Sequence, residues 1–159
     1  MTTIHTVALL IAAVGCGMVA GVFFAFSSFV MPALKQLRTV QGIAAMQSIN
    51  VSAVTPAFMS LLFGTAAVCL ALLVLEVTAF AGETSRLVQG ASIVYLLGVT
   101  GVTIVRNVPL NNRLAGLNPE SPDGTAFWSD YLNDWTAWNH LRTAAALIAT
   151  GMLMAALHT

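Results

Sequence analysis

One short stretch near the start of the last apolar segment holds side chains that could bind a planar molecule and move a proton. Trp135, Trp138, Asn139 and Arg142 recur at spacings of three or four, so they align along one side of a helix. Indole rings stack on flat ligands, and amide and guanidinium groups hydrogen-bond to oxygen atoms. His140 lies within the stretch, and an imidazole can take or give a proton near neutral pH. We interpret His140, Asn139 and Arg142 as candidate catalytic residues.

Further amide and aromatic side chains are expected at the same end of the molecule. Asn107 and Asn111 are four residues apart and share a helix face, and Asn107 completes the candidate catalytic set. The other candidates would contact the bound molecule: Gln47, Asn50, Asn111, Trp135, Trp138, Phe24 and Met31. In the simpler interpretation, such amides and tryptophans only satisfy helix ends and anchor the chain at a membrane surface.

Guanidinium groups near an apolar segment need partners, because an isolated charge is costly there. We therefore expect Asp130 or Asp134 to pair with Arg106, Arg113 or Arg142.

The sequence gives little support to a metal or haem site. No second histidine lies three or four residues from His140, so a haem or copper ion would need a ligand from another segment, such as Met31. We predict no cofactor and keep haem or copper as the less favoured alternative. Cys16 and Cys69 match no zinc or redox spacing, and we interpret them as small buried apolar residues.

The composition indicates that lipid surrounds these residues. Of the 159 residues 58% are hydrophobic and 8% are charged, and the mean hydropathy is +0.86. A water-soluble domain carries about 25% charged residues, so this chain cannot cover a soluble surface. Six basic and six acidic residues leave no basic patch, which excludes nucleic acid as a partner class.

Four apolar segments are long enough to cross the bilayer, which needs roughly 20 residues each. They predict one all-α domain over 1–159, a four-transmembrane-helix bundle with spans at about 7–30, 57–80, 87–105 and 138–157. No Lys or Arg precedes Lys35, so 7–30 is interpreted as a span and not as a cleaved signal peptide.

The connections between the spans also carry predictions. Pro32 should kink or end the first helix, and a short interfacial helix should follow over about 39–53 with Thr39 as its N-cap. Glu76 should snorkel towards the headgroups. The fourth helix should begin near Asp123, as a cytoplasmic extension of the last span.

Basic residues predict the orientation. The first and third connectors hold Lys35, Arg38, Arg106 and Arg113, whereas the second holds Arg86. The positive-inside rule then places the candidate site on the cytoplasmic side and both termini outside.

Several strings resemble the anthrone-oxygenase-like family of small four-span membrane proteins. They are GVFFAFSSFVMPAL, AMQSIN, RNVPLNNRLA and W-x-x-W-N-H-L-R-T, and the resemblance extends over about 15–146. Where the family commonly reads Asn-Pro-x-Phe, this chain has Thr55, Pro56, Ala57 and Phe58, so one amide is missing. Its matching positions are Asn50, Asn107, Asn111, Trp138, Asn139, His140 and Arg142.

The resemblance implies a bacterial inner-membrane enzyme that oxidises a lipophilic aromatic or phenolic substrate with molecular oxygen as co-substrate. His140 would be the base, Asn139, Asn107 or Arg142 would stabilise the oxyanion, and Trp135 and Trp138 would stack the rings. The alternative is a non-catalytic membrane protein that binds or carries a small lipophilic ligand. Association with further copies of the chain is left open.

Overall fold

The computed structural model describes residues 2–79 and 82–158, and helices form almost all of this part of the chain. The first rod comprises α1 (Thr3–Ala25), the π-helical η1 (Phe26–Val30) and α2 (Met31–Gln36). After α3 (Thr39–Ser52), α4 (Pro56–Ala79) forms the second rod. The third comprises α5 (Glu83–Val94), η2 (Tyr95–Gly101), η3 (Thr103–Asn107) and α6 (Val108–Ala115), and α7 (Pro122–Ala156) is the fourth.

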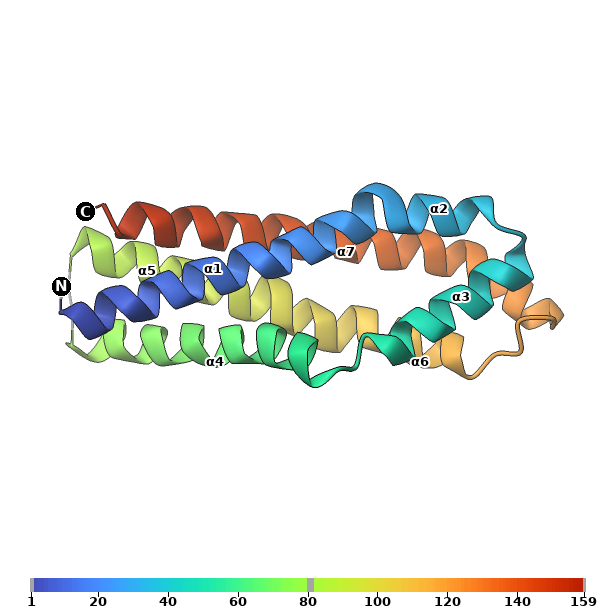
Figure 1. Ribbon diagram of the computed structural model, residues 1–159, viewed down its shortest axis with the longest axis horizontal. Coiled ribbons are helices and arrows are strands. Elements are labelled where there is room, and N and C mark those ends of the chain that lie inside the picture. Colours follow the sequence, from blue (N-terminus) through green and yellow to red (C-terminus); the bar gives the residue numbers. More distant parts are fainter. Residues whose placement is uncertain (1, 80–81, 159) are drawn as a thin grey trace.

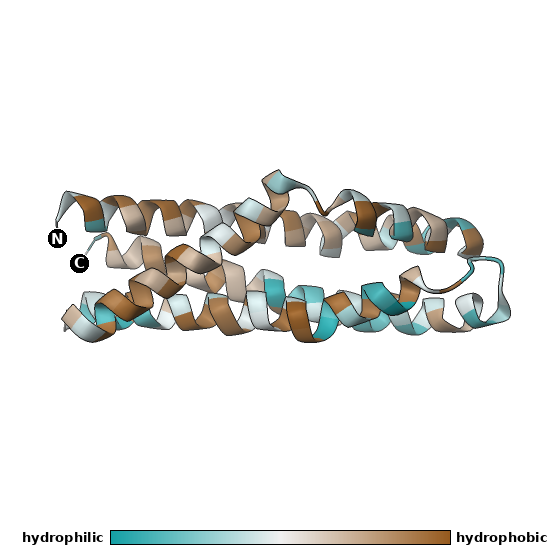
Figure 2. Cartoon of the chain, turned by 90° about the horizontal axis from the view of Figure 1, so that it is seen from below, coloured by the Kyte–Doolittle hydropathy of each residue, from teal (hydrophilic) through white to brown (hydrophobic). Residues whose placement is uncertain are grey.

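The four rods form an elongated bundle, as predicted (Figure 1). Both ends of the chain lie at one end of the bundle, and α2, α3 and α6 lie towards the other. Three rods are long and apolar enough to cross a membrane: Thr3–Gln36, Pro56–Ala79 and Glu83–Ala115. The fourth, α7, is not among them, although it packs along α1 and α5. Figure 2 shows hydrophobic residues dominating the half near the termini, while most hydrophilic residues gather in the other half.

Small residues let the rods approach closely in the apolar half. A Cβ on Gly98 would lie 2.6 Å from the Cβ of Ala145, and a Cβ on Gly15 would lie 2.3 Å from the Oγ1 of Thr65. These contacts bring the third rod against α7 and α1 against α4. Close backbone approach of this kind drives helix association in membranes, where burial of apolar surface gives no advantage over lipid.

Of the two outcomes predicted at Pro32, the end of the helix is wrong, because the helix continues through this residue to Gln36. The π-helical turn before it lets the amide of Met31 donate to the carbonyl of Phe26, five residues back, and Pro32 then falls in the first turn of α2. Proline is tolerated there because its missing N–H is not needed. Pro109 follows η3 in the same way, with the amide of Val108 donating to the carbonyl of Thr103.

Two helices have other bounds than the sequence suggested, and the start of a third is confirmed. Arg38, not Thr39, is the N-cap of α3, and Thr39 is already helical. The third rod is longer than 87–105, since it begins at Glu83 and continues to Ala115. The start predicted for the fourth helix near Asp123 is confirmed at Pro122, where the Oγ of Ser121 accepts a hydrogen bond from the amide of Gly124.

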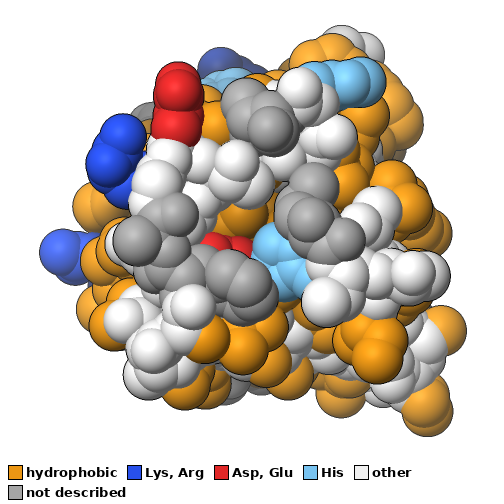
Figure 3. Space-filling model, turned by 90° about the vertical axis from the view of Figure 1, so that its left-hand side faces the viewer, with side chains coloured by type: hydrophobic (Ala, Val, Ile, Leu, Met, Phe, Trp, Pro, Cys, Tyr) orange, Lys and Arg blue, Asp and Glu red, His pale blue; other side chains and the backbone are white. Residues whose placement is uncertain are grey.

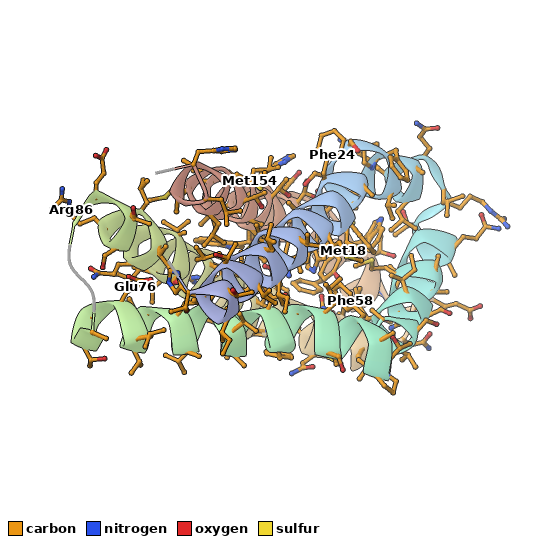
Figure 4. The ribbon with its side chains drawn as sticks, turned by 60° about the vertical axis from the view of Figure 1, so that its left-hand side comes forward. Met18, Phe24, Phe58, Glu76, Arg86 and Met154 are labelled. Atoms are coloured by element: carbon orange, nitrogen blue, oxygen red, sulfur yellow. The ribbon has the colours of Figure 1, made fainter. Side chains whose placement is uncertain are left out.

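The prediction that Glu76 snorkels is wrong as well. Its side chain is buried, and its Oε1 lies 2.6 Å from the Nε2 of His5 on α1. Figure 4 shows Glu76 directed into the bundle, whereas Arg86 points away from it. In Figure 3 an acidic and a histidine side chain meet in the middle of this end of the bundle. A carboxylate at this depth is stabilised by a partner inside the protein and does not need the headgroups.

We predict that Glu76→Ala lowers the free energy of unfolding by about 1–2 kcal/mol, because it removes a buried hydrogen bond between α1 and α4. The measurement is thermal unfolding of the protein in detergent, followed by tryptophan fluorescence. Glu83→Ala is the matched control, since Glu83 is exposed and should tolerate the change. Equal midpoints for the two variants would show that the His5 contact contributes nothing.

Candidate functional site

A cavity of about 180 Å³ lies where α1, α3, α4, η3, α6 and α7 meet. Its wall is mainly apolar and aromatic, and includes Phe23, Phe26, Phe58 and Leu62. Figure 4 shows Phe58 on the inner side of α4, directed towards the middle of the bundle. The polar residues on the wall are Asn50, Thr103, Asn107, Asn111 and Arg142. A mainly apolar cavity with a few convergent polar groups is the usual form of a small-molecule site.

Arg142 brings a positive charge to this cavity. The side chain is only 4% exposed. One terminal nitrogen donates to Oδ1 of Asn139 at 2.7 Å, and the other donates to Oγ1 of Thr103 at 3.2 Å. The guanidinium carbon lies 4.1 Å from the ring centroid of Phe23 and 5.2 Å from that of Trp135. All these neighbours are neutral, so the charge is oriented but not neutralised.

The ion pairs predicted for the arginines do not form in the described part of the chain. There, the one ion pair joins His5 to Glu76, at the other end of the bundle. Arg106 lies over the ring of Trp138 instead, and Arg113 lies over the ring of Phe127. Arg142 is therefore a buried cation with no carboxylate partner among the described residues. Such a charge is costly unless a partner arrives from outside the chain.

Asn139 holds this guanidinium in place from behind. Its amide nitrogen donates to the carbonyl of Phe23 and to the Oγ of Ser27, both at 2.7 Å, while its oxygen accepts from Arg142. The side chain is fully buried and does not line the cavity. Asn139 thus connects the end of α1 and the start of η1 to the arginine, which fixes where the charge lies.

Asn107 offers an open acceptor beside the charge. Its side chain is 1% exposed, and its amide nitrogen donates to the carbonyl of Trp135 at 3.2 Å. Its Oδ1 is buried and has no hydrogen-bond partner among the described residues. Buried polar atoms are nearly always paired, so an unpaired oxygen in a residue that lines the cavity is a candidate acceptor for a ligand donor.

Aromatic rings that are joined by hydrogen bonds and stacking close the cavity at one end. Oδ1 of Asn111 accepts two hydrogen bonds of 2.8 Å, from the hydroxyl of Tyr131 and from the Nε1 of Trp135. The rings of Trp128, Tyr131 and Trp135 stack in sequence, with centroids 5.7 and 6.4 Å apart. Burial raises the pKa of Tyr131, so its hydroxyl stays protonated and donates to Asn111.

The structure brings together about half of the residues selected from the sequence. Asn50, Asn107, Asn111, Trp135 and Arg142 all line the cavity. They come from the three separate stretches that were expected at one end of the bundle.

Two of the selected residues lie on other sides of α7. His140 is exposed and lines a separate hollow with Lys35, and Trp138 lines another hollow with Arg106 and Asp134. The physical reason is the helical turn of about 100° per residue, which sends the neighbours of Asn139 to either side of it. The predicted meeting of His140 and Trp138 with the asparagines is therefore wrong.

Three further selected residues have other environments. Gln47 donates to the carbonyls of Leu114 and Leu117 at 2.8 and 2.9 Å, and so caps the end of α6. Met31 is buried in the aromatic cluster beside the cavity. Phe24 is 59% exposed and points away from the bundle in Figure 4.

Sequence reasoning missed Thr103, Phe23 and Phe58. Thr103 could have been found, because it precedes Asn107 by four residues and so continues the face that Asn107 and Asn111 share. The two phenylalanines carried no signal of their own, since the chain has eight and seven of them lie in the first two predicted spans.

The donor set of the cavity suits an organic anion better than a metal ion. No histidine, cysteine or carboxylate is among its lining residues. In the described residues, no three His, Cys, Asp or Glu side chains gather to hold a metal ion. A guanidinium, amides and flat rings can instead bind a planar oxygen-bearing aromatic molecule.

Comparison with known proteins adds one match. The family model described as Anthrone oxygenase matches residues 54–152, which is more than half of the chain. Neither a curated protein nor a solved structure gave a match. The matched region includes α4, the third rod and most of α7, and therefore most of the polar residues of the cavity.

We predict that Asn111→Ala destabilises the protein by about 1–3 kcal/mol, because Tyr131 and Trp135 would lose their shared acceptor in a buried place. The change should be measured as a lower midpoint of thermal unfolding in detergent. Asn112→Ala is the control, since Asn112 is exposed on the same helix. A midpoint for Asn111→Ala as high as that of Asn112→Ala would contradict the assigned role.

Proposed function

The chain belongs to the anthrone oxygenase family, and from this we propose that it oxidises a lipophilic phenolic aromatic substrate with molecular oxygen. The cavity beside Arg142 would be the place of reaction. We keep the cytoplasmic position of this end of the bundle as part of the proposal.

The observation that carries the proposal is the buried guanidinium of Arg142, which lines an aromatic cavity and has no carboxylate partner in residues 2–79 and 82–158. A buried cation is stabilised by an anion brought in with the ligand. The anion of an enolised aromatic ketone fits, because its negative oxygen belongs to a flat, otherwise apolar ring system. That oxygen would bind the guanidinium, and the rings would lie among Phe23, Phe58 and Trp135.

The proposed reaction balances without a cofactor. An anthrone first loses one methylene proton, which leaves an aromatic oxyanion. The electron-rich carbon reacts with oxygen to give a peroxide, which collapses to the quinone. Overall the methylene carbon loses two hydrogen atoms and gains one oxygen atom, and the second oxygen atom leaves as water. Oxygen is the oxidant, and the substrate supplies the electrons.

Four polar residues in or beside the cavity have a role in this proposal. Arg142 stabilises the oxyanion, because a cation close to a phenol lowers its pKa and favours the ionised form. Asn107 accepts a hydrogen bond from a second hydroxyl group and orients the rings. Asn139 and Thr103 act as positioning residues that hold the guanidinium. No lining residue is a carboxylate or imidazole, so we assign the departing proton to water and not to His140.

The same absence of a base on the cavity wall favours a second candidate, a binding protein or carrier for a lipophilic phenol. In that case the cavity would bind the ligand without converting it. The two candidates differ in one measurement: oxygen uptake by the purified protein with an anthrone, compared with the rate in buffer and detergent alone. Binding without oxygen uptake above that rate would support the carrier.

We predict that Arg142→Gln lowers kcat/KM for anthrone oxidation by about 10²–10³-fold, the usual effect of removing a group that stabilises an oxyanion. Oxygen consumption and quinone absorbance provide the measurement. Arg106→Gln is the matched control, since that arginine is exposed and lies outside the cavity. Equal losses in the two variants would contradict the role of Arg142.

A spectroscopic measurement separates this role from a purely structural one. A hydroxyanthraquinone changes colour when its phenol ionises, so its bound spectrum reports the pKa of the ligand. With the wild-type protein the bound dye should ionise at a lower pH than with Arg142→Gln, and Arg142→Lys should restore part of the shift because it keeps the charge.

We predict that His140→Ala retains activity within about twofold, because the imidazole is exposed and lines a different hollow from the cavity. The measurement is oxygen uptake at several substrate concentrations. A loss of kcat by about 10²-fold or more, with ligand binding unchanged, would make His140 the general base after all.

A further inference from the structure

We propose that the ligand reaches the cavity sideways from the lipid, through an opening between α4 and the segment formed by η3 and α6. The inference rests on the proposed function for the class of ligand alone. The position of the opening follows from the residues of the cavity wall and from what lies around them.

The exposed members of the cavity wall lie on this side of the bundle. Val54, Phe63 and Val108 line the cavity and are 69%, 43% and 40% exposed. On α4, Leu61, Thr65 and Val68 line a different groove, against α1, whereas Met59, Leu62 and Phe63 on the other face line the cavity together with Val108 of α6. The cavity therefore reaches the surface between these two rods, and its rim consists of apolar side chains.

The depth of the rim favours lipid over water. Phe63 lies seven residues after Pro56, the first residue of α4, which is about 10 Å along a helix axis. Residues Pro56–Ala79 are long and apolar enough to span the membrane, so this part of the rim lies at the level of the acyl chains. Val54 precedes the helix and lies nearer the headgroups.

The route along the bundle axis is closed. The stacked rings of Trp128, Tyr131 and Trp135 fill the space beyond the cavity, and each is 5% exposed or less. Tyr131 and Trp135 donate hydrogen bonds to Asn111, and Trp128 stacks on Tyr131, which holds the three rings in place. Gln47 joins α3 to the end of α6 over the same region. An uncharged aromatic molecule dissolved in the bilayer thus has a direct route, whereas one arriving along the bundle axis would have to displace a packed core.

The distribution of apolar and polar residues in the cavity is consistent with entry from the lipid. Apolar residues form the rim, and Asn107 and Arg142 lie on the inner wall and are nearly fully buried. A ligand would enter as a neutral phenol and meet the charge only at the inner wall. Ionisation there would hold it, because an anion is poorly soluble in the acyl region.

The test measures how fast a probe binds to the full-length protein in phosphatidylcholine nanodiscs. The probe is 1-hydroxyanthraquinone, and quenching of tryptophan fluorescence reports its arrival near Trp135. At a constant aqueous concentration of the probe, the association rate should rise with the number of probe molecules per lipid. The water-soluble anthraquinone-2-sulfonate should associate much more slowly. Equal rates for both probes, or a rate set by the aqueous concentration, would overturn the inference.

Two substitutions at the rim should act in opposite directions. Val108→Phe narrows the opening and should slow association about tenfold, whereas Phe63→Ala widens it and should accelerate association severalfold. Both should change the dissociation rate by a similar factor, so that the equilibrium affinity stays nearly constant. Ile104→Phe and Leu70→Ala are the controls, since both residues are exposed on the same rods but lie outside the cavity wall.

The outcomes separate this inference from the proposed function. Rates that follow the rim substitutions without any oxygen-dependent turnover would leave the lateral entrance standing and remove the oxygenase. Turnover with association rates that match those of the controls would leave the oxygenase and remove the lateral entrance. A wild-type protein whose fluorescence the probe does not quench would overturn the lateral entrance.

Discussion

The structure depends on one constraint, which is that a guanidinium is held inside an apolar bundle by neutral neighbours alone. Arg142 is fixed by Asn139 and Thr103, and it lies against the faces of Phe23 and Trp135. These contacts orient the charge without cancelling it. The cavity, its aromatic walls and its open amide acceptor are all arranged around this group, and their chemistry follows from its charge.

The irregular helical turns explain how the backbone supports this arrangement. η1 and η3 each precede a proline in the first turn of the next helix, and both adjoin the cavity. A π-helical turn shifts the side chains that follow it around the axis relative to a regular helix, and such turns occur frequently at functional sites. Asn139 bonds to Phe23 and Ser27 at one of them, and Asn107 ends the other. Thus η1 supplies part of the contact that holds Asn139, and η3 positions Asn107.

The sequence predicted the helical bundle well because lipid imposes simple rules: long uncharged segments must be helical, and polar groups must be enclosed. It also identified Asn107, Asn111, Trp135 and Arg142, which share faces at spacings of three or four. It failed for residues that are adjacent in sequence, because neighbouring side chains on a helix point in directions about 100° apart. Asn139 and His140 therefore face different surroundings. Contacts between residues far apart in the sequence could not be predicted either. His5 and Glu76 are 71 positions apart, and neither has a local pattern that indicates their contact.

Glu76 and Arg142 are both buried in the described part of the bundle, but they differ in whether the chain supplies an oppositely charged partner. Glu76 has its partner in the chain, His5, and its carbonyl oxygen accepts hydrogen bonds from Ser85 and Gln89. That end is satisfied from within and holds two helices together. Arg142 has no such carboxylate in the described residues, and it borders a cavity with an apolar rim. A charge matched within the protein stabilises the fold, whereas a charge that is only oriented can still attract an anion.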